Sequence, residues 1–111
     1  MTKIYLDTAD INEVTQLIDY LPIAGVTTNP TIAAKSGKPL SLLLPQLRQT
    51  LGHNGLLFAQ VLADRAEDMV EEAKRLNAYV DNLVVKIPVN KEGLRAMKML
   101  QSSPIRVLGT A

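Results

Sequence analysis

The chain has 111 residues, of which 47% are hydrophobic and 21% are charged, a composition typical of one folded domain that is long enough to bury a core. Twelve Lys plus Arg and eleven Asp plus Glu give a formal net charge of +1, so composition supplies no field of one sign that would attract nucleic acid or an anionic membrane. The chain has no cysteine, which excludes disulfides, thiolate metal ligands and a cysteine nucleophile, and fits a reducing, cytoplasmic compartment.

Five short apolar runs are the expected strands, and longer segments with helical periodicity separate them. This spacing favours β/α units and a parallel sheet over hairpins, because hairpins need only short turns. We therefore predict an α/β fold of the parallel (β/α) TIM-barrel type, with residues 1–111 forming the amino-terminal portion of a single barrel. The expected strands are 3–7, 23–27, 56–61, 82–87 and 105–110.

The first two segments between strands carry helix signals. Asp10 is expected to cap a helix that ends before Pro22, with Glu13 completing a capping box. Its apolar face comprises Ile11, Val14, Leu17 and Ile18. The next segment is longer, and we expect it to break at Gly37 and to hold Pro45 in a first turn or at a kink.

The last two segments repeat the pattern. Asp64 with Glu67 is expected to form another capping box, and Asn90 to cap the final helix, which closes at 102–104. The apolar stripe of the first of these helices comprises Ala66, Met69, Val70, Ala73, Leu76 and Val80. That of the second comprises Leu94, Met97 and Leu100.

Each expected strand is apolar along its body and becomes polar at its carboxyl end, the edge where parallel α/β folds bind ligands. The period of two along a strand places Val84 and Lys86 on one face and leaves the other face to pack on helices. The sequence therefore predicts a site at this edge. Its residues are Asp7, Thr27–Asn29, Gln60, Lys86 and Thr110.

Lys86 is the centre of the predicted chemistry because it follows Leu83, Val84 and Val85 in an apolar strand. Poor solvation disfavours a charged ammonium, and a neutral amine is a nucleophile that can form a Schiff base with a carbonyl. The alternative is a lysine that extends to solvent or pairs with Asp7.

The other candidates also have two interpretations. Asp7 could orient Lys86 or move a substrate proton, or it could simply begin a turn. The segment Thr27–Asn29 could hold a polyhydroxylated substrate, or it could be an ordinary turn. Gln60 holds a water or a substrate hydroxyl, or else is a buried structural amide. His53 lies in a Gly-rich turn and is expected to be an exposed loop residue.

Several chemistries lack support in the sequence. No glycine loop for phosphate, no cluster of His and acids with metal-ligand spacing and no serine with a histidine partner is present. No stretch approaches ~18 consecutive apolar residues, and the start carries acids instead of a signal peptide, so we expect neither a membrane span nor export.

Five segments carry a resemblance to a known family over essentially the whole chain: LDTAD, AGVTTNPTIAAKSGKPL, LFAQVLA, NLVVKIPVNKEGLRAMKML and VLGTA. Together they resemble the transaldolase family of class I aldolases. Within that family the chain is most similar to the small fructose-6-phosphate aldolases, because Gln60 stands where transaldolases usually carry a glutamate.

The resemblance implies roles for the predicted site. Lys86 would form the Schiff base with the donor, Asp7 and Thr27–Asn29 would bind it, and Gln60 and Thr110 would help to place the catalytic water. The implied reaction is reversible cleavage of fructose 6-phosphate into dihydroxyacetone and glyceraldehyde 3-phosphate. It implies no metal or organic cofactor, and it implies homo-oligomers for a full-length protein.

The resemblance also implies an eight-stranded barrel, of which this chain would contain the first five strands. The family's tyrosine acid/base and its phosphate-binding groups would lie in the remaining units, and an open sheet would expose two unpaired edge strands. Two further hypotheses stand beside the aldolase. One is a transaldolase that passes a dihydroxyacetone unit to an acceptor sugar, and the other is a non-catalytic, truncated remnant.

Overall fold

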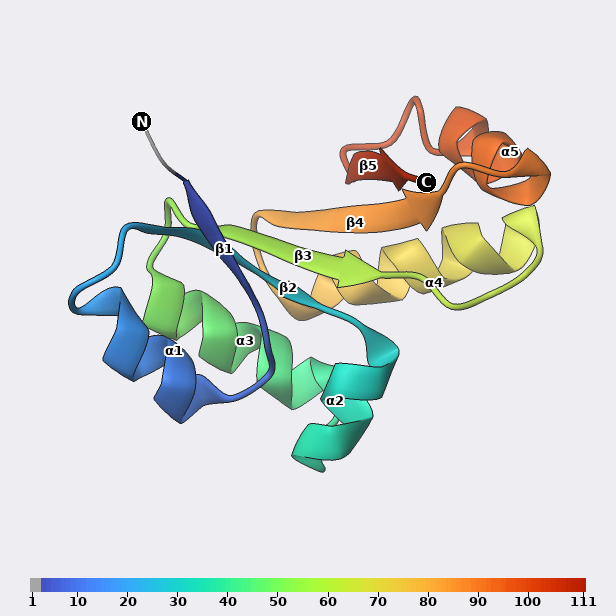
Figure 1. The fold of residues 1–111 in the computed structure, drawn as a ribbon. Coiled ribbons are helices and arrows are strands. Elements are labelled where there is room, and N and C mark those ends of the chain that lie inside the picture. Colours follow the sequence, from blue (N-terminus) through green and yellow to red (C-terminus); the bar gives the residue numbers. More distant parts are fainter. Residues whose placement is uncertain (1–2) are drawn as a thin grey trace.

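Five parallel strands form one sheet in the computed structural model, which describes residues 3–111. The strands lie side by side in chain order, and each pairs in parallel with the next (Figure 1). They are β1 (Ile4–Asp7), β2 (Ile23–Thr28), β3 (Leu56–Gln60), β4 (Leu83–Pro88) and β5 (Arg106–Thr110). The predicted parallel α/β architecture is therefore confirmed, and this arrangement is consistent with part of a TIM barrel.

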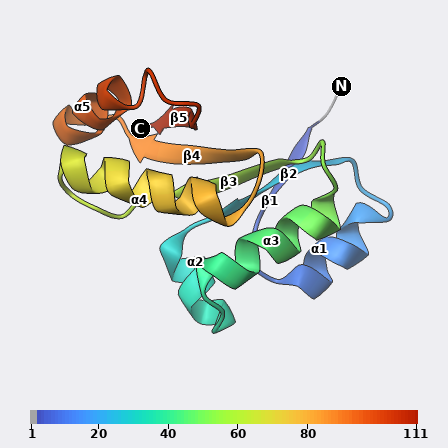
Figure 2. The same ribbon diagram turned by 180° about the vertical axis from the view of Figure 1, so that it is seen from behind.

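Helices connect every pair of neighbouring strands and cover one face of the sheet (Figure 1). Between β2 and β3 the chain forms two helices, and between the other strands it forms one. Seen from behind, α3 and α4 lie side by side on the same face of the sheet (Figure 2), and they are in contact. The helices are α1 (Ile11–Ile18), α2 (Pro30–Ser36), α3 (Leu40–Leu51), α4 (Ala66–Tyr79) and α5 (Lys91–Met99).

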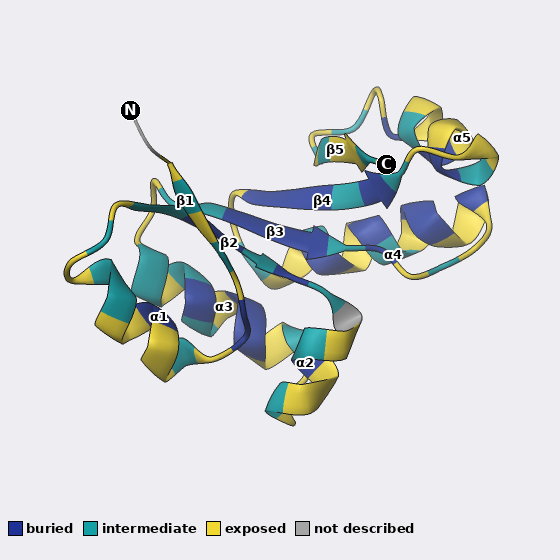
Figure 3. Cartoon of the chain, viewed as in Figure 1, coloured by how far each residue is buried: buried dark blue, intermediate teal, exposed yellow. Residues whose placement is uncertain are grey.

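The side chains of the central strands that face the helices are the most deeply buried, and the polar ends of the opposite face are less buried (Figure 3). In β4, Leu83, Val85 and Ile87 are buried against the helices, whereas Lys86 on the opposite face is half-buried. The same alternation in β3 buries Leu57 and Ala59. The burial of these apolar side chains is the main stabilisation of the layered packing.

The helix starts confirm two of the predicted caps. The Asp10 carboxylate accepts from the backbone N–H groups of Asn12 and Glu13 at 3.0 and 3.2 Å, and the Asn90 side chain accepts from Gly93 at 2.8 Å. The reciprocal half of the first capping box does not form. The Asp10 N–H donates to the Thr8 hydroxyl at 3.0 Å instead.

The predicted capping box of Asp64 with Glu67 is wrong. Helix α4 begins at Ala66, and its N-cap residue Arg65 contributes no side-chain hydrogen bond. The Ala66 N–H donates instead to a carboxylate of the next helix, Glu92, at 3.1 Å. A tertiary contact therefore replaces the local cap, because it satisfies the same backbone donor.

The predicted apolar face of α5 is partly wrong, since Leu94 is 54% exposed. The buried positions of the helix are Gly93 and Ala96, and Leu100 is buried just beyond its end. A Cβ atom at Gly93 would overlap the Pro88 carbonyl oxygen. The missing side chain therefore lets the first turn of α5 approach the end of β4, and this contact rotates Leu94 outward.

The long segment after β2 breaks at Gly37 as predicted. Gly37 adopts a left-handed conformation with φ 73° and closes α2, because glycine enters this region without a steric penalty. Pro45 lies inside α3 and not in its first turn. Among the helices of residues 3–111, none has the length and apolar character needed to cross a membrane.

Arg48 ties together the loops at the amino ends of the strands. Its guanidinium donates to the carbonyl oxygens of Gly52, His53, Gly55 and Asn82, and Asn82 in turn accepts from Arg106 at 2.8 Å. His53 is exposed, as predicted. This network fixes the loops on the side of the sheet opposite the polar strand ends.

We expect Gly93→Ala to destabilise the fold although alanine is the better helix former. Its methyl group would collide with the Pro88 carbonyl and force α5 away from β4, which we expect to cost about 1–3 kcal/mol. Urea unfolding monitored by circular dichroism measures the change. Lys98→Ala, at an exposed position of the same helix, is the control, and a stabilised Gly93→Ala variant would contradict the packing described above.

Candidate functional site

Lys86 and Gln60 are direct neighbours across the sheet. Strands β3 and β4 pair in parallel with Gln60 opposite Lys86, and the Lys86 carbonyl accepts from the Val61 N–H at 3.1 Å. Partners in a parallel ladder point to the same face, so both side chains lie on the face away from the helices. On the other side, β5 places Leu108 opposite Lys86.

The Lys86 ammonium group is unengaged in this arrangement. Within residues 3–111 its side chain forms no ion pair and no hydrogen bond with another side chain, and Asp7 is not its partner. Its two neighbours across the sheet are a neutral amide and an apolar side chain. The amine is therefore half-buried, accessible and free of a competing carboxylate.

Apolar side chains form the surface below Lys86 on this face. Val84 precedes Lys86 by two residues and pairs with Phe58, and both are less than one tenth exposed. The ring of Tyr5 on β1 meets Phe58 edge-on at 6.1 Å between centroids. Gly25, which pairs with both Tyr5 and Leu56, presents no side chain between these strands.

Asp7 and Thr27 form a second polar pair on the same face. They are register partners of β1 and β2, and the Thr27 hydroxyl donates to the Asp7 carboxylate at 2.8 Å. Their row of the sheet continues through Phe58 and Val84, one side-chain row below Gln60 and Lys86. The structure therefore groups the predicted polar strand ends into two pairs, one on β1 and β2 and the other on β3 and β4.

Asn29 and Thr110 lie at the same edge of the sheet in different settings. Asn29 is the N-cap of α2, and its side-chain oxygen accepts from the Ile32 N–H at 2.9 Å. Its amide NH₂ group has no such role and remains a donor. Thr110 is half-buried and pairs with Pro88, so it lies one row above Leu108 and Lys86.

Two glutamates that sequence reasoning missed hold the β3–α4 loop (61–65), which follows Gln60. Glu72 accepts from the N–H groups of Leu62 and Ala63 at 2.7 and 3.0 Å, and Glu92 accepts from Ala66. The pKa of Glu92 is lowered by the hydrogen bond from Ala66 and by the Arg95 guanidinium. Helical periodicity identifies these glutamates only as surface residues.

A recess near the β1–α1 loop does not contain the predicted residues. A cavity of about 660 Å³ lies between the β1–α1 loop, α2 and α3, with Thr8, Lys35 and Gln46 among its lining residues. None of the predicted site residues lines it. Within residues 3–111, no three His, Asp or Glu side chains come together as a metal-binding group.

A comparison with protein-family models finds a match to the family described as Transaldolase/Fructose-6-phosphate aldolase. The match covers residues 4–111. It begins at the first residue of β1 and includes all five strands, so every predicted site residue lies within it.

We expect Asn29→Ala to lower the free energy of unfolding by about 1 kcal/mol, because the Ile32 N–H loses its capping acceptor. Asn29→Ser retains an oxygen that caps a helix and should be close to wild type. Urea titration of the three proteins tests this role. Equal stability of the alanine variant and the wild type would show that the cap contributes nothing.

Proposed function

Since the chain belongs to the transaldolase/fructose-6-phosphate aldolase family, we propose that its site is that of a class I aldolase in which Lys86 forms a Schiff base with a ketose. The members of this family are aldolase and transaldolase enzymes. The proposal goes beyond this general activity in three respects: it identifies the nucleophile, the residues that place the catalytic water, and the sugar substrate.

The observation that carries the proposal is the register of β3 and β4, which sets Gln60 beside an unengaged Lys86. A Schiff-base lysine must be free to reach a carbonyl carbon, and no ion pair or side-chain hydrogen bond among the described residues holds Lys86 away from it. Val84 and Phe58 give the strand face next to Lys86 an apolar surface. Gln60 both donates and accepts hydrogen bonds, which suits the binding of a water molecule.

The proposed reaction follows from amine chemistry. The neutral Lys86 amine attacks the ketose carbonyl carbon, and the carbinolamine takes up one proton and loses water to give a protonated imine. The proton is released again when water hydrolyses the imine at the end of the cycle. When the C3–C4 bond breaks, its electron pair moves into the imine to form an enamine, and the proton of the C4 hydroxyl passes to a base as the aldehyde leaves. The enamine then takes up a proton at carbon. Water hydrolyses the resulting imine, which releases the ketone and restores the amine.

The remaining residues have supporting roles in this proposal. The Asp7 carboxylate, held by the Thr27 hydroxyl, accepts from donor hydroxyls, and the free NH₂ group of Asn29 donates to a substrate oxygen. Gln60 and Thr110 place the water that hydrolyses the imine. These assignments need neither metal nor organic cofactor, because the protonated imine itself is the electron sink.

We further propose fructose 6-phosphate as the ketose, with dihydroxyacetone and glyceraldehyde 3-phosphate as the products. Gln60 supports direct cleavage over transfer of the three-carbon unit, since a transaldolase usually has a glutamate at this position. An amide cannot exchange a proton as a glutamate does, so its contribution is limited to hydrogen bonding.

We expect dihydroxyacetone followed by borohydride to leave a stable reduced adduct on Lys86, because reduction turns the imine into a secondary amine. Peptide mapping by mass spectrometry identifies the modified residue. Lys86→Met should abolish the adduct. Lys91→Met, which removes an exposed lysine of α5 in the same chain, should leave it unchanged.

An adduct spread over the surface lysines, or one that persists in Lys86→Met, would exclude Lys86 as the specific nucleophile. The same mapping without borohydride gives the background of the assay, because an unreduced imine hydrolyses during digestion.

We expect release of glyceraldehyde 3-phosphate from fructose 6-phosphate without any acceptor sugar, because water and not an aldose ends the cycle. A coupled dehydrogenase assay with and without erythrose 4-phosphate measures this. Gln60→Glu should increase the dependence on the acceptor. A wild-type protein that turns over only when erythrose 4-phosphate is present would be a transaldolase.

A further inference from the structure

We propose that Glu72 is a positioning residue, whose carboxylate holds the β3–α4 loop so that Gln60 stays in place beside Lys86. This inference rests on the function proposed above, because it concerns the water that Gln60 places. Glu72 lies on α4 and reaches back across the loop that leads into its own helix.

The hydrogen bonds of the loop show why a remote carboxylate matters. After Gln60, the Val61 N–H still bonds to β4, through the Lys86 carbonyl. The next two donors, Leu62 and Ala63, have left the sheet, and both converge on one oxygen of Glu72. The Glu72 carboxylate therefore accepts the hydrogen bonds of the first two residues after the β3–β4 ladder ends.

Stability alone does not require these two bonds. Leu62 is 62% exposed, so the loop lies at the protein surface. Water would satisfy the donor without fixing the loop in space, whereas a charge-assisted pair of bonds from a packed helix does both. The specific effect of the Glu72 contact is thus to fix the position of the carboxyl end of β3. A group that takes part in a reaction needs support of this kind.

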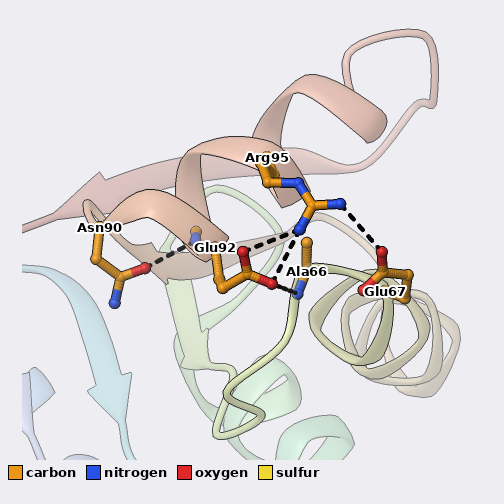
Figure 4. A network of polar contacts seen from close by, with 6 residues as sticks. Ala66, Glu67, Asn90, Glu92 and Arg95 are labelled. Atoms are coloured by element: carbon orange, nitrogen blue, oxygen red, sulfur yellow. Dashed lines mark hydrogen bonds and ion pairs between the residues drawn. The ribbon is translucent and has the colours of Figure 1, made fainter.

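A second carboxylate holds the far end of the loop (Figure 4). Glu92 lies in the first turn of α5, shortly after the strand that carries Lys86, and it accepts from the Ala66 N–H at the start of α4. Arg95 binds Glu92 at 2.9 Å and Glu67 at 3.2 Å, so it links the first turns of the two helices. This second contact ties the end of the loop to the strand that carries the nucleophile.

Of the two anchoring carboxylates, Glu72 binds the loop residues that lie closer to Gln60 in the sequence. Loss of Glu92 would free the start of α4, whereas loss of Glu72 would free the two residues that follow Val61. We therefore expect Glu72 to affect the step that depends on Gln60, which is hydrolysis of the imine. Imine formation from dihydroxyacetone is the reverse of this hydrolysis, so its rate should fall by the same factor, whereas the equilibrium amount of imine on Lys86 should be unchanged.

The experiment compares Glu72→Ala, Glu72→Gln and Glu71→Ala with the wild type. Glu72→Gln keeps an oxygen that accepts both N–H groups without the charge. Glu71 is the matched control because it is the adjacent glutamate, is exposed, and among the described residues forms an ion pair with exposed Lys74 at 3.6 Å. The measurements are amide hydrogen exchange of Leu62 and Ala63 by NMR, kcat and KM for fructose 6-phosphate, and borohydride trapping at Lys86.

In Glu72→Ala we expect exchange at Leu62 and Ala63 about tenfold faster, and kcat about tenfold lower, with KM not raised and the equilibrium yield of the Lys86 adduct retained. Glu72→Gln should recover most of both losses, and Glu71→Ala should match the wild type. Unchanged exchange in Glu72→Ala would overturn the proposal, and so would faster exchange with an unchanged kcat. If Glu72→Ala does not fold, Glu72→Gln is measured by amide exchange and kcat instead. We then expect a smaller increase in exchange at Leu62 and Ala63 together with a smaller decrease in kcat.

Failure of the underlying function gives a different result. A wild-type chain without any Lys86 adduct would refute the Schiff-base proposal itself, whatever the exchange rates of the variants. A wild-type chain with the adduct, combined with normal turnover in Glu72→Ala, would refute only the role of Glu72.

Discussion

The parallel register between β3 and β4 is the constraint on which the candidate site depends. It sets Gln60 opposite Lys86 and, through β5, Leu108 on the other side. Burial of Leu83, Val85 and Ile87 under the helices holds this register, because a shift by one residue would turn the lysine into the apolar layer and expose the core. The same hydrophobic contacts that stabilise the sheet therefore determine which face carries the amine.

Much of this arrangement could be predicted from local patterns. Alternation in β4 specifies which side chains share a face, and the helical segments between strands predict parallel pairing in chain order. Together these patterns predict that Gln60 and Lys86 lie at one edge of one sheet. The caps at Asp10 and Asn90 were predictable for the same reason, since an N-cap acts within three residues of its own position.

The features that escaped prediction depend on contacts between distant segments. The Ala66 N–H at the start of α4 donates to Glu92, which lies on the next helix. The local sequence instead predicts a capping box of Asp64 with Glu67, and nothing near Ala66 indicates the distant acceptor. The orientation of α5 follows from the approach of Gly93 to Pro88, which a hydrophobic stripe containing Leu94 does not reveal. Sequence placed Asp7 and Thr27 at strand ends, but only their register shows that they bind each other.

The neutral side chain of Gln60 links the electrostatics of the site to its hydrogen bonding. A carboxylate in its place, as a transaldolase usually has, would attract a lysine ammonium group and help to hold the two side chains together. An amide lacks that attraction. The alignment of Gln60 must then come from the backbone, and the backbone leaves the sheet directly after Val61. Glu72 and Glu92 therefore hold the loop from a distance, while Lys86 keeps neutral neighbours in the sheet.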